Sequence, residues 1–157
     1  MNLTLDHAPR DVHELVAFRI GQQEFAVDIA FVHEIRGWVL ETALPHAPHY
    51  IRGVINLRGS VLPILDLAER LRLAKACPTA RHVIMIVNVG SQMLGLLVDE
   101  VSGIQTVKET SFRPLPKVGA GLTCQFVQSI LAVDGRMIVV LALDEVFPVD
   151  ADMSVAA

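Results

Sequence analysis

The sequence predicts an all-β fold in which two small β-barrels pack together in pseudo-twofold fashion, with only short helical turns. Short apolar runs rich in β-branched residues are separated by glycine-containing turns, which is typical of strands. The chain also contains an internal repeat. Because one repeat alone would be only marginally stable as an independent fold, we expect two copies to pack together.

The predicted strands follow one another along the chain as the segments 15–21, 25–29, 53–59, 61–67, 83–90, 94–101, 130–135 and 137–143. Two further stretches favour a helical turn. The first is 48–52, where a proline suits the first turn and a glycine follows the last residue. The second is 66–73, where Asp66 can cap the first turn.

The repeat aligns in two ungapped blocks: residues 15–35 match 84–104, and residues 51–71 match 127–147. Turn glycines and apolar positions coincide, including the pairs Gly21/Gly90, Gly59/Gly135, Val32/Val101, Ile35/Ile104, Ile64/Val140 and Leu71/Phe147. We therefore expect each half to form a hairpin, a connecting loop, a second hairpin and a closing helical turn. The two half-barrels should span about 15–75 and 82–147, interleave at their ends, and meet at a seam lined by equivalent positions.

Composition excludes several classes of protein. Of 157 residues, 52% are hydrophobic and 19% are charged, with a net charge of −4, which argues against a nucleic-acid surface. The longest apolar run, 137–143, is far below the ~18 residues of a membrane-spanning helix. Residues 1–12 and 151–157 should be flexible tails of a domain over 13–150, and the first tail lacks a secretory signal. Cys77 and Cys124 form no paired spacing, as expected for free thiols in a reducing cytoplasm.

No motif for catalysis, cofactor binding or metal binding is found in the sequence. His46 and His49 flank Pro48 with no other ligand nearby in sequence, so we expect a surface loop rather than a zinc site. The chain has no phosphate-binding loop, no dinucleotide fingerprint and no nucleophile elbow. We therefore expect a protein that is not an enzyme and has no cofactor and no metal.

One turn has an unusual composition. Arg58-Gly59 occupies the place that Asp134-Gly135 has in the second half, and Asp-Gly between apolar strands predicts a turn with both central residues at positive φ. Arginine is rare in that conformation. Either both turns share the geometry and Arg58 is a compromise that marks function, or the first is a type II turn or a bulge in which only Gly59 needs positive φ. If Arg58 lies against the barrel, Glu34 is its candidate partner.

Several segments together resemble the CheW family, the coupling proteins of bacterial chemotaxis. They are Glu34-Ile35-Arg36-Gly37, GVINLRG at 53–59, VLPILDL at 61–67, GLLVDEV at 95–101 and DGRM at 134–137. The resemblance runs from about Leu15 to Phe147. Kinase regulatory domains and multidomain coupling proteins share this fold, but the chain has no room for a kinase core, so it resembles the stand-alone adaptor.

The resemblance implies two five-stranded barrels packed face to face in a non-catalytic scaffold. Its implied partners are the regulatory domain of the histidine kinase CheA and the cytoplasmic tip of transmembrane chemoreceptors, in membrane-associated arrays. Alone, the chain is expected to be a cytoplasmic monomer that binds no nucleic acid and does not insert into the membrane.

Matching positions assign the implied sites residue by residue. The receptor-binding groove consists of six aliphatic side chains: Val16, Ile29, Val32, Ile35, Val101 and Ile104. The coupling motif consists of Glu34, Asn56, Arg58 and Gly59, in which the acid and the arginine form a pair. Trp38 is expected to anchor a loop.

Two other interpretations stand beside this one. The chain could be the adaptor of a chemosensory system for surface motility or a second messenger, because such adaptors share fold and contacts. Less favoured is a small-ligand-binding or enzymatic barrel, which predicts convergent polar groups in the seam, whereas the implied groove positions are all aliphatic. Without the resemblance, those aliphatic residues would be interpreted as ordinary core.

Overall fold

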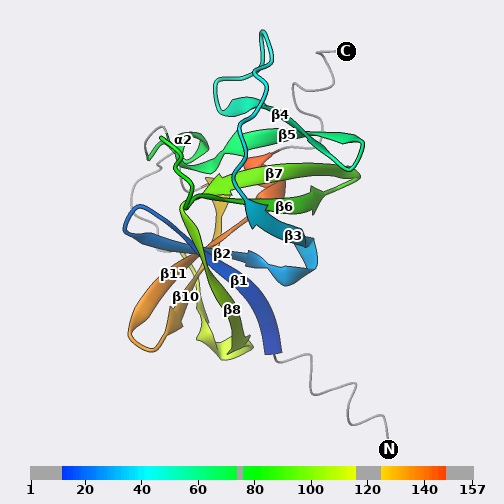
Figure 1. Ribbon diagram of the computed structural model, residues 1–157. Helices are drawn as coiled ribbons and strands as arrows, with labels where there is room; N and C mark the ends of the chain where they lie inside the picture. Colours follow the sequence, from blue (N-terminus) through cyan, green and yellow to red (C-terminus); the bar gives the residue numbers. More distant parts are fainter. Residues whose placement is uncertain (1–11, 74–75, 116–124, 148–157) are drawn as a thin grey trace, which may run out of the picture.

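The computed structural model describes residues 12–73, 76–115 and 125–147 (Figure 1). The expected tails lie outside these residues, except that Val12 already begins the first strand. Cys124 also lies outside them. No helix in the described residues is long and apolar enough to cross a membrane.

The first half of the chain contains two hairpins and a strand between them. The elements are β1 (Val12–Ile20), β2 (Gln23–Asp28), the 3₁₀ turn η2 (Ile29–Phe31), β3 (Val32–Gly37), β4 (Ile51–Leu57), β5 (Ser60–Asp66) and α2 (Leu67–Arg70). The second half repeats the order with β6 (Val83–Val89), β7 (Gln92–Val98), β8 (Glu100–Lys108), η3 (Glu109–Ser111), β9 (Phe112–Arg113), β10 (Val127–Val133), β11 (Arg136–Leu141) and α3 (Leu143–Val146).

This order confirms the repeat and corrects two of its details. Each half has a third strand, β3 or β8, where only a connecting loop was expected. The expected helical turn at 48–52 is absent, because β4 already begins at Ile51. Only one bond of a turn remains there, from the Ile51 N–H to the Pro48 carbonyl at 2.9 Å.

The strands form two sheets that mix both halves. One has the order β8-β1-β2-β11-β10-β9 and the other β3-β6-β7-β5-β4. The strand that follows each first hairpin, β3 or β8, pairs with the first hairpin of the other half. The parallel pairings β2–β11 and β5–β7 then join each first hairpin to the second hairpin of the other half. This exchange goes beyond the interleaving at the ends that was expected for 15–75 and 82–147.

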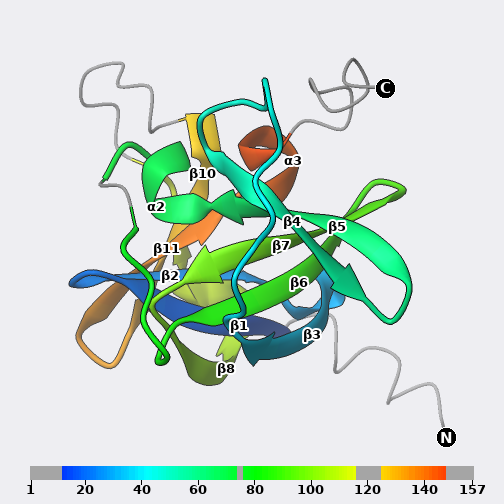
Figure 2. The same cartoon turned by 45° about the horizontal axis from the view of Figure 1, so that its top comes forward.

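Neither sheet closes into a barrel by direct pairing of its edge strands. Instead, the chain that leaves one edge strand crosses to the other edge. After β8 it pairs as β9 with β10, and after β3 it pairs with β4 through a bridge between Thr42 and Val54. The sheets therefore have six and five strands rather than five each, and curl into open barrels that Figure 2 shows packed against each other.

The core has a central part between the sheets and one smaller part inside each. The central cluster takes side chains from both sheets and from α2 and α3, including Val16, Phe18, Met85, Leu67 and Phe147. Ile55, Leu62, Ile64 and Ile84 fill the five-stranded sheet, and Leu131, Ile138, Val140 and Leu15 occupy the equivalent positions of the six-stranded one. The pseudo-twofold relation therefore extends from the topology to individual core side chains.

Candidate functional site

The two matched turns have the same backbone geometry, which settles the alternatives left open by the sequence. Arg58 and Gly59 have φ values of 50° and 91°, and Asp134 and Gly135 have 48° and 77°. Positive φ at both central residues is the geometry of a type I′ hairpin turn. Arg58 therefore adopts a left-handed backbone conformation that is unfavourable for arginine.

Side chains around the first turn hold it in place. The Asn56 Oδ1 accepts a hydrogen bond from the Gly59 N–H at 2.8 Å. An Arg58 guanidinium nitrogen lies 2.5 Å from the Glu34 Oε1, and this ion pair joins the β4–β5 turn to β3. Because β3 and β4 are opposite edges of the five-stranded sheet, the pair links the two edges where no strand pairing does.

The ion pair shifts both groups toward their charged forms. The hydrogen bond from Arg58 is the largest influence and lowers the pKa of Glu34. Burial opposes it, and the positive charges of Arg58, His33 and Arg36 lower the pKa further, so that the net direction is downward. The hydrogen bond to Glu34 raises the pKa of Arg58. The Arg58 side chain is 65% exposed, whereas that of Glu34 is 28% exposed, so the pair presents its arginine to solvent.

Five of the six predicted groove residues are at least partly exposed, in η2 or on the edge strands β3 and β8. Ile35 on β3 and Ile104 on β8 are 44% and 58% exposed, and both strands are sheet edges. Ile29, Val32 and Val101 are partly buried and pack against the central cluster. We call these five residues the aliphatic edge surface.

Val16 is the exception among the predicted groove residues. It is only 2% exposed and belongs to the central core cluster. On β1 it lies opposite Ile104 of β8, in the same way that Met85 of β6 lies opposite Ile35 of β3. Val16 therefore belongs to the core beside Ile104 and is not part of the aliphatic edge surface.

A second, more buried ion pair was not identified from the sequence. The Glu41 side chain is 4% exposed and accepts hydrogen bonds from the Arg52 Nε at 2.7 Å and from the Trp38 Nε1 at 2.9 Å. Burial alone would raise the pKa of Glu41, but these hydrogen bonds outweigh it and lower the pKa. The indole bond confirms Trp38 as the anchor of the loop after β3. Of these three residues, only Trp38 was expected from the sequence to anchor the loop. Glu41 and Arg52 belong to different segments, so the sequence did not indicate their contact.

The histidines considered for a metal site have other surroundings. The His49 Nδ1 lies 2.9 Å from the Glu69 Oε2, and His46 sits at a loop position with a φ of 61°. Within residues 12–73, 76–115 and 125–147, no three His, Cys, Asp or Glu side chains are grouped as metal ligands.

The sequence of the chain matches a known protein family. The model of the CheW-like domain matches residues 14–150, nearly the whole chain. The chain belongs to the CheW family. It is 50% identical over 142 residues to the chemotaxis protein CheW of Rhizobium meliloti, covering 90% of this chain and 92% of that one. It is 54% identical over 134 residues to a probable chemotaxis protein CheW of Rhizobium etli, covering 85% and 86% of the two chains.

A solved structure supports the fold of this CheW protein. The crystal structure of the scaffolding protein TtCheW from Thermoanaerobacter tengcongensis superposes with a TM-score of 0.80 at 33% identity, covering 88% of this chain and 94% of that one. These findings confirm the expected family, the two-sheet fold and a non-catalytic scaffold of chemotaxis signalling. The individual partners and the residues that contact them remain predictions.

Proposed function

We propose that this CheW protein couples transmembrane chemoreceptors to the regulatory domain of the kinase CheA, in the cytoplasm at membrane-associated arrays. The observation that supports it best is the aliphatic edge surface. Ile35 and Ile104 are equivalent by the repeat, lie on the edge strands of different sheets, and are both exposed. Equivalent exposed isoleucines on the edge strands of the two sheets would suit the apolar side chains of a docking helix.

The coupling motif is the second part of the proposal. Arg58 occupies a strained turn position and pairs with Glu34 on β3, next to Ile35 of the aliphatic edge surface. This pair joins the β4–β5 turn to β3. A charged rim beside an apolar surface gives a partner both contact area and orientation.

The test places a charge on the aliphatic edge surface of the full chain, in the variants Ile35→Asp and Ile104→Asp. A charge buried against an apolar receptor side chain is penalised by more than ~1.4 kcal/mol, so the affinity for a receptor cytoplasmic fragment should fall at least about tenfold. The melting temperature should change little, because both side chains are largely exposed in the free protein. The valines are less suitable targets, since Val32 and Val101 pack partly against the core.

Met137→Asp is the matched control. Met137 is 59% exposed, almost the same as Ile104, but lies beside the β10–β11 turn. Receptor and CheA affinities are measured for all three variants by titration calorimetry. Loss of receptor affinity in the isoleucine variants alone, with CheA binding retained, supports the proposal. Unchanged receptor affinity in folded isoleucine variants would place the receptor surface elsewhere.

A further inference from the structure

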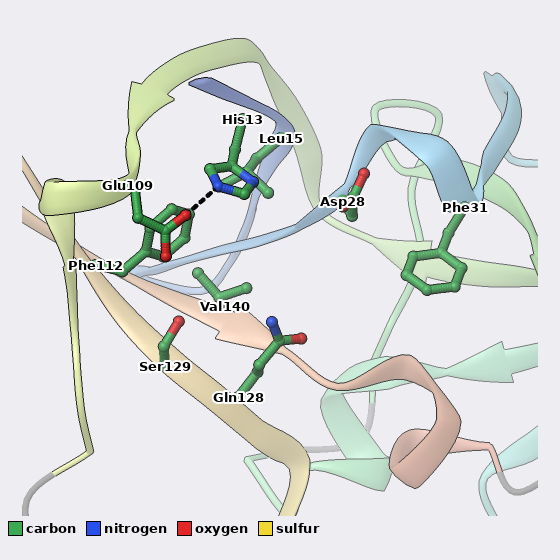
Figure 3. Close-up of a pocket in the computed structure, with 9 residues that line it drawn as sticks. All are labelled: His13, Leu15, Asp28, Phe31, Glu109, Phe112, Gln128, Ser129 and Val140. Atoms are coloured by element: carbon green, nitrogen blue, oxygen red, sulfur yellow. Dashed lines mark hydrogen bonds and ion pairs between the residues drawn. The ribbon is translucent and has the colours of Figure 1, made fainter. Parts of the chain in front are cut away.

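We propose that this chain also binds a small organic cation, an amine with an apolar body, in a cavity at the mouth of the six-stranded sheet (Figure 3). The cavity has a volume of about 490 Å³, which lies within the range of small-molecule sites. Its lining comes from β1, β9, β10 and β11, together with Asp28 at the end of β2, Phe31 in η2 and Glu109 in η3. This site goes beyond the coupling function, which uses the outside of the molecule.

The cavity lies on a different face of β1 from the aliphatic edge surface. Leu15 lines the cavity and belongs to the core inside the six-stranded sheet. Its neighbour Val16 belongs to the central cluster that supports the aliphatic edge surface. Because successive side chains of a strand point to opposite faces, one β1 strand separates the two sites. A ligand in the cavity therefore need not compete directly with a partner on Ile104.

The lining combines negative charge with aromatic rings. Asp28 and Glu109 contribute carboxylates, and among the described residues no lysine or arginine lines the cavity. Glu109 accepts a hydrogen bond from His13, which orients its carboxylate at the mouth. Phe112 packs edge-on against His13 with ring centroids 5.2 Å apart, and Phe31 is 39% exposed across the opening. Carboxylates and aromatic faces together favour a cation that carries apolar surface.

One polar atom in the wall has no partner. The Ser129 hydroxyl is buried and makes no hydrogen bond with any described residue. Figure 3 shows it pointing from β10 toward the space between Phe112 and Val140, with the Gln128 amide beside it. A buried hydroxyl without a partner is unfavourable by about 1–3 kcal/mol, and a ligand N–H or O–H in the cavity would supply the missing bond.

The repeat provides an internal comparison, because the five-stranded sheet contains the equivalent positions. There, Leu97 replaces Asp28 and is buried in the apolar cluster. Gly53 replaces Ser129, and any side chain at Gly53 would overlap the backbone of Thr42. Where one sheet is filled by apolar side chains and a close backbone, the other has an open cavity with polar walls. The repeat therefore does not by itself produce this cavity, which depends on the side chains of the six-stranded sheet.

The experiment is an NMR titration of the full ¹⁵N-labelled chain with three ligands of the same size and different charge: 2-phenylethylamine, 2-phenylethanol and phenylacetate. The amine should shift the amide signals of Ser129, His13 and Phe31. The alcohol should bind at least about tenfold more weakly, and the acid more weakly still. No shift at these residues with about 10 mM amine, or equal affinity for amine and alcohol, would overturn the proposal.

Variants that preserve shape test each carboxylate. Glu109→Gln and Asp28→Asn should each weaken amine binding about three- to fivefold, as expected for partly exposed charge pairs. Asp28→Asn keeps the side-chain oxygen that accepts the Ala30 N–H at the start of η2. Glu100→Gln is the control, since Glu100 is 62% exposed on β8, the strand that precedes the η3 turn of Glu109, but is not among the described residues that line the cavity. Equal affinities in Glu109→Gln and Glu100→Gln would contradict the assigned role of Glu109.

Discussion

Arg58 occupies a backbone conformation that suits asparagine or glycine far better than arginine. Its φ of 50° lies in the left-handed region, where a Cβ crowds the following carbonyl. The equivalent turn in the second half has Asp134, a residue that tolerates this geometry. The turn alone therefore does not explain the arginine, and the contact that sets Arg58 apart from Asp134 is its ion pair with Glu34.

We predict that Arg58→Asn stabilises the protein and impairs coupling at the same time. Asparagine relieves the turn, which should raise the melting temperature by about 1–3 °C. The lost ion pair is largely exposed and offsets little of this gain. In a reconstituted array of receptor, CheA and this chain, kinase activation should fall. Glu34→Gln is the partner control, because it removes the same pair without changing the turn. Full kinase activation by both variants would show that the pair has no part in coupling.

Glu41 predicts a pH-dependent contribution to stability. Its pKa is lower in the folded chain than its ordinary value of 4.5, because the carboxylate accepts bonds from Arg52 and Trp38. Its contribution is therefore complete above pH 4.5 and is lost as the pH falls through the lower folded pKa.

At pH 7, Glu41→Gln should lower the free energy of unfolding by about 2 kcal/mol, since bonds to a buried charged group are lost. The difference from the parent chain should shrink steadily below pH 4.5, as measured by urea unfolding at several pH values. A difference that stays constant down to pH 3 would mean that the carboxylate does not titrate with folding.

Single residues also show where sequence reasoning ends. The comparison of Arg58 with Asp134 across the repeat was enough to mark the turn, and the structure confirms the pair with Glu34. Burial was harder to predict: Val16 and Ile35 are both strand aliphatics, yet their exposed fractions are 2% and 44%. The difference depends on which strand becomes a sheet edge, and only the topology determines that. The cavity residues were missed for the same reason, because Ser129 and Asp28 meet only after the hairpins exchange.

At the scale of elements, α2 and α3 differ in how they begin. The Asp66 Oδ1 accepts the Glu69 N–H at 3.2 Å, and the Oδ2 accepts the Ala76 N–H at 2.9 Å. The equivalent residue before α3 is Ala142, which has similar backbone angles but no side chain to cap the helix. The cap at Asp66 was predicted from the sequence, whereas its second bond to Ala76 reaches into the connecting loop and was not.

The difference between the two helix starts predicts opposite effects for substitutions at Asp66 and Ala142. Asp66→Ala should destabilise by about 2 kcal/mol, because it removes a helix cap and leaves two partly buried N–H groups without their partner. Ala142→Asp should stabilise by about 0.5–1 kcal/mol by adding the missing cap. Urea unfolding measures both, and Ala142→Ser serves as an uncharged control that separates capping from the charge near Asp144 and Glu145. If Ala142→Asp and Ala142→Ser both destabilise, the two helix starts are not equivalent.

The sequence predicted the elements that have local signals but not those that depend on distant pairing partners. The paired hairpins were predicted because alternating apolar residues and turn glycines are local signals. The strands β3 and β8 were not, because half of their residues are exposed and their pairing partners lie in the other half of the chain. Pro48 suggested a helix start, but Ile51 is recruited into β4, where pairing with Leu65 outweighs local preference.

For the whole molecule, the two sheets have the same strand order under the repeat but are packed with different side chains. At one equivalent position β2 has Ala26 and β7 has Gly95. A Cβ at Gly95 would lie 2.7 Å from side-chain carbons of Ile64 and Ile84. The six-stranded sheet has the smaller Val140 in place of Ile64, which leaves room for Ala26. A larger side chain at one position is therefore balanced by a smaller one at its neighbour, so both sheets keep a filled core although their core residues differ.

The exchange of strands predicts that neither half of the chain folds alone. Within the first half, β1 pairs with β2, and β4 pairs with β5 and through one bridge with Thr42, while β3 finds its partner β6 in the second half. Within the second half, β8 likewise depends on β1. Isolated hairpins are at best marginally stable in water, and the central cluster requires side chains from both halves.

We therefore expect the fragments 1–78 and 79–157 to be unfolded separately and to fold when mixed. Circular dichroism should show a cooperative melting transition only in the equimolar mixture, with a midpoint that rises with concentration, because folding is then bimolecular. Each fragment at twice its concentration in the mixture is the control for self-association. The two compact half-barrels that the sequence alone suggests would instead each melt cooperatively without the other. A melting transition in either single fragment would therefore show that a half can build its own core, and that the exchanged pairings are not essential to it.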